Sequence, residues 1–174
     1  FALRNHVLQS LPKEIRKDAE PYMTFILECS EKYKVDPFWI TAMIWTESHF
    51  KHESTSPLGA SGLMQIMPYT MDYIEEKMSI GVFLNHSLTK SRADTSMLSP
   101  NGRKLSKSYK NIEYGVSYFK HLLENFNYNF EYATVAYNMG PGLIQVRLKK
   151  NLPVGRRNDY LIKVKKAYQT LIKG

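Results

Sequence analysis

Apolar residues recur along this chain at intervals of three and four, the spacing that places side chains on one face of an α-helix. One such series is Ile15, Ala19, Met23 and Ile26. Asp36-Pro37 adds a helix-start signal, because aspartate caps free backbone N–H groups and the first helical turn tolerates proline. No run of alternating apolar and polar residues competes with this pattern. The sequence therefore predicts a mostly α fold.

The same signals set the expected elements. We expect helices over residues 12–26, 37–45, 70–78, 130–137, 143–149 and 158–172, and a further helix capped by Asn111. Residues 52–68 place glycines and prolines around a compact apolar run, which predicts a tucked loop or a short extended segment. Residues 79–110 are polar and basic, and there we expect a long insertion loop.

Composition excludes several classes of protein. The 174 residues suit one domain, and a hydrophobic content of 43% excludes a disordered tail or a fibre. A net charge of +8 points to an acidic partner, such as nucleic acid, anionic lipid or bacterial cell wall. The single cysteine, Cys29, excludes an intramolecular disulfide and is expected to be buried. No apolar stretch is long enough to span a membrane, and no signal peptide is visible. Because the chain starts at Phe1, we expect a processed or trimmed product.

Glu47 is the first candidate for chemistry. It falls in the last turn of the helix predicted from Pro37, with Met43 and Ile44 on the same face. Apolar neighbours and the negative end of a helix dipole both disfavour a carboxylate, so the pKa of Glu47 should be raised. A general acid needs such a carboxyl near neutral pH. The alternative is an exposed glutamate that merely ends a helix.

Two further segments hold polar groups suited to a ligand. Gln65 offers an amide between apolar pairs, inside a glycine-containing loop whose backbone could approach a ligand closely. Tyr137 and Asn138 end a predicted helix just before Gly140, where a phenol and an amide could bind a sugar. Both segments also have structural readings, a satisfied glutamine and a helix C-cap.

Taken in order, these segments form a pattern. It comprises Glu47-Ser48-His49-Phe50, Ser56-Pro57 with Gly59-Ala60, Gly62-Leu63-Met64-Gln65-Ile66-Met67-Pro68, Asn111-Ile112 with Gly115, Ala136-Tyr137-Asn138-Met139-Gly140-Pro141-Gly142, and Asn158-Asp159-Tyr160. The pattern resembles the soluble lytic transglycosylase catalytic domain, a family related to goose-type lysozymes. The resemblance extends from about residue 22 to 167. It implies a lysozyme-like single catalytic domain over 1–174, with an insertion at about 79–110.

The resemblance also implies an activity and a site. Peptidoglycan glycan strands would be cleaved at the β-1,4 bond between N-acetylmuramic acid and N-acetylglucosamine. Glu47 would be the catalytic acid and then base, without metal or cofactor. The substrate-binding residues implied are Ser56, Gln65, Met67, Tyr137, Asn138 and Tyr160.

The product depends on how many carboxylates act. Most glycosidases use two, but the family motif supplies one, so the C6 hydroxyl would attack C1 and give a 1,6-anhydro product. Glu53 departs from the pattern as a candidate second carboxylate that could orient a water. The alternative is therefore a lysozyme-type muramidase that hydrolyses the same bond, including on de-N-acetylated wall. A weaker hypothesis is a non-catalytic wall-binding module.

The remaining expectations concern partners and location. We expect a monomer that binds no nucleic acid, because no predicted helix carries a dense basic face. His49 and His52 are expected to be exposed rather than metal ligands. The substrate implies a periplasmic or secreted enzyme.

Overall fold

The computed structural model describes residues 2–78 and 102–174, and within them the protein is helical. The helices are α1 (Ala2–Ser10), α2 (Lys13–Tyr33), α3 (Pro37–Ser48), α4 (Pro68–Lys77), α6 (Gly102–Asn125), α7 (Phe130–Met139), α8 (Pro141–Lys149) and α9 (Asp159–Lys173). The extended structure in this part of the chain is limited to the bridges Thr55–Ser61 and Ser61–Ile66. The mostly α prediction is therefore confirmed, as is the tucked loop within 52–68.

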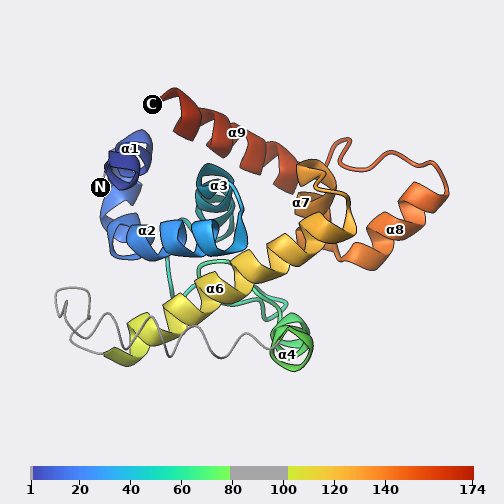
Figure 1. The fold of residues 1–174 in the computed structure, drawn as a ribbon, viewed down its shortest axis with the longest axis horizontal. Helices are drawn as coiled ribbons and strands as arrows, with labels where there is room; N and C mark the ends of the chain where they lie inside the picture. Colours follow the sequence, from blue (N-terminus) through green and yellow to red (C-terminus); the bar gives the residue numbers. More distant parts are fainter. Residues whose placement is uncertain (1, 79–101) are drawn as a thin grey trace.

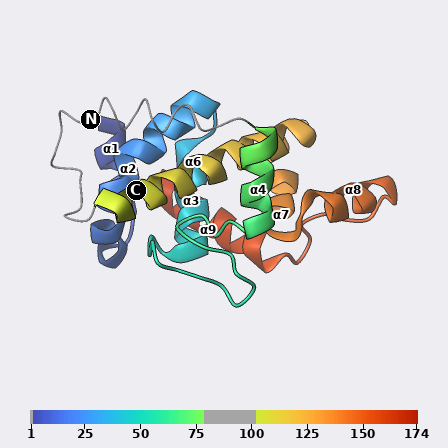
Figure 2. The same ribbon diagram turned by 90° about the horizontal axis from the view of Figure 1, so that it is seen from below.

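Helix α3 lies at the centre of the molecule (Figure 1). It packs along α9 and against α2, and α2 packs in turn against α6. Its residues from Trp39 to Ile44 are all buried, so the helix is apolar on every side, as expected of a core helix. Figure 2 shows the loop after α3 projecting from the helices, and α8 forming one end of the molecule.

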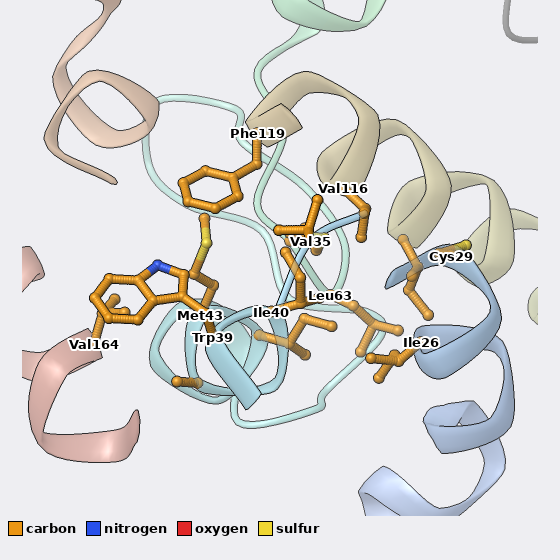
Figure 3. Close-up of a cluster of buried hydrophobic side chains, with 14 of the residues drawn as sticks. Ile26, Cys29, Val35, Trp39, Ile40, Met43, Leu63, Val116, Phe119 and Val164 are labelled. Atoms are coloured by element: carbon orange, nitrogen blue, oxygen red, sulfur yellow. The ribbon is translucent and has the colours of Figure 1, made fainter. Parts of the chain in front are cut away.

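The core joins side chains from most of the chain (Figure 3). Around α3 it gathers Ile26 and Cys29 from α2, Val116 and Phe119 from α6, Val164 from α9, and Leu63 from the loop. Cys29 is fully buried, as the sequence predicted. The participation of Leu63 means that the loop after α3 is anchored in the core.

Two helix starts are capped by side chains, and the sequence predicted the cap at Asp36. The Asp36 Oδ1 accepts hydrogen bonds from the N–H groups of Phe38, at 2.8 Å, and Trp39, at 3.4 Å. Asn158 likewise caps α9, accepting from the Leu161 N–H at 2.8 Å. These contacts satisfy N–H groups that the first helical turn leaves unpaired.

The prediction that Asn111 begins a helix was wrong. Asn111 lies buried in the middle of α6, because its side chain binds the loop after α3 instead of capping its own helix. Residues 102–110 are helical rather than part of an insertion loop, and the rest of that predicted loop, 79–101, lies outside the described residues. Helix α1 was not predicted. No described helix is both long and apolar enough to cross a membrane.

Candidate active site

A cleft of about 280 Å³ opens where the end of α3 meets the loop, α4, α6 and α7. Its walls are formed by Glu47, Ser56, Leu58, Ala60, Gln65, Ile66, Met67, Tyr69, Thr70, Tyr118, Tyr137, Asn138, Gly140 and Pro141. The cleft wall thus includes all the predicted site residues except Tyr160 and Glu53. Glu47 is the one carboxylate among these lining residues.

Glu47 lies in the last turn of α3, where most of its side chain is removed from water. Burial raises its pKa to about 7, from a usual value of 4.5, because a charged carboxylate loses its hydration there. A side-chain interaction with Tyr160 favours the charged form and offsets part of this rise. The sequence predicted a raised pKa, and burial is its main cause. A carboxyl with this pKa exists in both protonation states near neutral pH, as acid–base chemistry requires.

Tyr160 approaches Glu47 from the first turn of α9. Its hydroxyl oxygen is buried and completes no hydrogen bond of regular geometry within the described part of the chain. The carboxyl of Glu47 is the charged group close to it, and burial together with that charge raises the pKa of Tyr160 well above its usual value. The phenol therefore stays protonated and presents a donor toward Glu47.

Tyr137 joins the far wall of the cleft to the loop. Its hydroxyl donates a hydrogen bond to the backbone carbonyl of Met64 at 2.9 Å. Burial and the nearby charge of Glu47 raise the pKa of Tyr137 well above its usual value. The phenol thus holds the loop segment next to Gln65 in place, while the following residue, Asn138, is exposed at the cleft edge.

The loop is braced by its own polar side chains. The amide nitrogen of Gln65 donates to the carbonyls of Ser54 and Gly62, at 2.9 Å each, and Gln65 adopts a left-handed backbone conformation with φ of 48°. The Ser56 hydroxyl accepts a hydrogen bond from the Ala60 N–H at 3.0 Å. Both residues therefore hold the backbone of the loop in shape. Both also line the cleft.

Asn111 fixes the same loop from α6, a role that the sequence reasoning missed. Its Oδ1 accepts from the Met64 N–H at 2.8 Å, and its Nδ2 donates to the Ser61 carbonyl at 2.9 Å. Gly62 leaves the space that this side chain needs, since a Cβ there would lie 2.5 Å from the Asn111 amide carbon. The sequence signal for this role was the position of Asn111 among the apolar residues of the predicted helix.

Ser48 ties the loop to α3 directly. Ser48 directly follows Glu47, and its buried hydroxyl donates a hydrogen bond to the Leu63 carbonyl at 2.8 Å. This role of Ser48 was not predicted from the sequence. The loop is consequently fixed to α3, α6 and α7 around Glu47.

Glu53 lies apart from the cleft. Its side chain is 70% exposed, lies 3.6 Å from His52, and lines a separate cavity beside α6. His49 and His52 are exposed, as predicted. Across residues 2–78 and 102–174, no group of three or more histidine, cysteine, aspartate or glutamate side chains is arranged to hold a metal ion.

Comparison with known families decides the assignment. Residues 24–159 match the model of the transglycosylase SLT domain. The chain belongs to this family. Among curated relatives, the SLT domain described here is 34% identical over 102 residues to soluble lytic murein transglycosylase of Salmonella typhimurium, covering 59% of this chain and 13% of that protein. It is 38% identical over 63 residues to membrane-bound lytic murein transglycosylase C of Edwardsiella ictaluri, covering 36% and 18%.

Solved structures agree with the fold. The 70-kDa soluble lytic transglycosylase of Escherichia coli matches with a TM-score of 0.68 at 22% identity, covering 87% of this chain and 24% of that one. An inactive mutant of lytic transglycosylase Slt from Pseudomonas aeruginosa matches with a TM-score of 0.56 at 25% identity, covering 85% and 22%. The lysozyme-like fold prediction is confirmed. This chain spans less than a quarter of the length of each of these relatives.

Proposed function

We propose that this SLT domain is a single catalytic domain that cleaves peptidoglycan between N-acetylmuramic acid and N-acetylglucosamine. The observation that carries the proposal is a carboxyl, Glu47, with a pKa of about 7 in the wall of a cleft. Relatives named lytic murein transglycosylases support the choice of substrate. A glycosidic bond is cleaved when its leaving oxygen receives a proton, and Glu47 is suited to give one.

The proposed reaction uses Glu47 twice. Its protonated carboxyl first gives a proton to the glycosidic oxygen, and the bond from that oxygen to C1 of the muramic residue breaks. The carbonyl oxygen of the substrate's own N-acetyl group stabilises the resulting positive charge at C1. The Glu47 carboxylate then removes the proton of the C6 hydroxyl, whose oxygen bonds to C1. The product is a 1,6-anhydromuramoyl end, no water is consumed, and Glu47 regains its proton.

The neighbours of Glu47 fit these two roles. Burial favours the protonated acid of the first step, and the Tyr160 hydroxyl favours the carboxylate of the second. Ser56, Gln65, Met67, Tyr137 and Asn138 line the cleft and would contact the sugars on either side of the cleaved bond. Tyr160 would act through Glu47, as a positioning residue.

The competing enzyme is a muramidase that adds water at C1. It would need a group to orient that water, and Glu53 was the candidate. The exposed position of Glu53 outside the cleft favours the mechanism with one carboxylate. A hydrolase acting on de-N-acetylated wall would also lack the N-acetyl oxygen used above.

Glu47→Gln is the variant that tests the proposal, because it keeps the shape of the side chain and removes the acid. We expect wild-type protein to release soluble fragments from purified sacculi, and Glu47→Gln to release none while still sedimenting with them. Glu53→Gln is the matched control and should cleave like wild type. A wild-type protein that binds sacculi but releases nothing would support the wall-binding module instead.

The substrate also sets the proposed location. Because peptidoglycan lies outside the cytoplasm, we propose a periplasmic or secreted enzyme. It would act as a monomer on glycan strands, since Glu47 and the cleft residues all come from one chain.

A further inference from the structure

A patch of aromatic side chains continues the cleft onto α4 and α6. Tyr69 and Tyr73 are four residues apart on α4, so they lie on the same face of that helix. Tyr69 lines the cleft and is 66% exposed, whereas Tyr73 lies beyond the lining residues and is 39% exposed. Neighbouring tyrosines in water leave apolar ring surface uncovered, and such a surface beside a cleft is typical of a binding site.

The rings of this patch are connected to the cleft. The Tyr118 ring, on α6, has its centroid 5.8 Å from that of Tyr137 and 6.4 Å from those of Tyr73 and His121. The Tyr73 and His121 centroids are 5.8 Å apart. Helix α4 packs against α6 (Figure 2). We call Tyr69, Tyr73, Tyr118 and His121 the aromatic rim.

Hydrogen bonds hold the outer part of the aromatic rim in place. The Tyr73 hydroxyl lies 3.2 Å from Nε2 of His121, and the Asn125 amide nitrogen lies 3.0 Å from the same ring nitrogen. The two outer rings are therefore positioned before a ligand arrives. A ligand that stacks on them loses less free energy to side-chain ordering.

We propose that the aromatic rim binds a sugar ring of the glycan strand, beyond the residues that flank the cleaved bond. Pyranose rings carry C–H groups with a small positive charge, which match the negative face of an aromatic ring. Their hydroxyls match the polar edges of His121 and Asn125. The continuity of the rim with the cleft makes the glycan already bound there the occupant, and in this sense the inference rests on the proposed function.

Binding to glycans of different lengths tests the aromatic rim. The measurement is titration of Glu47→Gln protein, which should not cleave, with a single disaccharide and with purified strands several disaccharides long. Adding Tyr73→Ala should weaken binding of the long strands about tenfold more than binding of the disaccharide, the size of one aromatic contact. Tyr73→Phe keeps the ring but loses the hydrogen bond to His121, so it should weaken binding of long strands less than Tyr73→Ala does. Tyr128→Ala, which removes another exposed tyrosine, is the matched control and should show no such length dependence.

Other results would overturn the inference. Equal weakening at both lengths would mean that Tyr73 acts through the shape of the cleft, and no weakening at either length would mean that the rim binds no sugar. In both cases, wild-type release of fragments from sacculi would leave the proposed function standing. A wild-type protein that neither binds strands nor releases fragments would overturn the proposed function, and the rim's role with it.

Discussion

The Tyr137 hydroxyl and the backbone carbonyl of Met64 are joined by a hydrogen bond of 2.9 Å, across 73 positions of sequence. This bond ties α7 to the loop after α3, directly beside Glu47. The cleft therefore depends on contacts between segments that meet only in the folded chain.

Removing this hydroxyl should loosen the cleft. Tyr137→Phe is expected to lower the free energy of unfolding by about 1 kcal/mol, since the Met64 carbonyl loses a buried partner. Cleavage of sacculi should fall about fivefold, as expected if the transition state loses a comparable free energy. Chemical denaturation and fragment release measure the two effects. Tyr132→Phe, on the same helix, should change neither, and equal behaviour of the two variants would contradict the role of Tyr137.

The raised pKa of Glu47 makes stability depend on pH. The folded carboxyl, with a pKa of about 7, binds its proton more tightly than an ordinary carboxyl at 4.5, so protonation stabilises the fold. This stabilisation is complete below about pH 4.5 and is lost as the pH rises through 7. The gap between the two pKa values corresponds to at most about 3 kcal/mol.

Glu47→Gln carries no charge at any pH, so we expect it to be more stable than wild type at pH 8 and to approach wild type at pH 4. The measurement is the difference in free energy of unfolding across that range. A Glu47→Gln difference that stays constant with pH would contradict the raised pKa.

Asn111 should contribute to stability through two backbone partners. Asn111→Ala leaves the Met64 N–H and the Ser61 carbonyl without their side-chain partner, and we expect a loss of about 3 kcal/mol. Asn111→Asp keeps the acceptor for Met64 but places a carboxyl oxygen against the Ser61 carbonyl in a buried site, so it should destabilise the fold as well. Thermal or chemical unfolding distinguishes them, with the exposed Glu124→Ala on α6 as control. A loss no larger than that of the control would refute the anchoring role.

Gly115 provides space for the same loop. An alanine Cβ at this position would lie 2.7 Å from the Met64 Cβ, although alanine is otherwise favoured over glycine within a helix. Gly115→Ala is therefore expected to cost about 2 kcal/mol. Combining it with Met64→Ala should cost less than the sum of the two single changes, because alanine lacks the Met64 Sδ and Cε that would crowd the new Cβ, although the contact with the Cβ of residue 64 remains. Additive costs would mean that the two residues do not compete for space.

Local signals in the sequence predicted much of the fold and its site. Asp36 acts within one helical turn, so its capping was visible in the sequence. The raised pKa of Glu47 was visible because its apolar neighbours lie three and four residues back. The order of the motifs carried the family resemblance.

What the sequence did not predict depends on distant partners. Asn111 looks like a cap in isolation, and its true partners lie about fifty positions earlier. The start of α6 was missed for a similar reason, since Tyr109 is buried against Phe25 of α2, with ring centroids 4.7 Å apart. The exposure of Tyr69 and Tyr73 likewise follows from how α4 packs on α6. Tertiary packing decides each of these positions.

Mass spectrometry of the fragments released from purified sacculi tests the central claim most directly. With the wild-type protein we expect muropeptides that end in 1,6-anhydromuramic acid, each lighter by one water than the hydrolysed product. Glu47→Gln should yield no fragments. Reducing-end muropeptides that have gained a water, or undiminished release by Glu47→Gln, would contradict a mechanism in which Glu47 acts alone as acid and base.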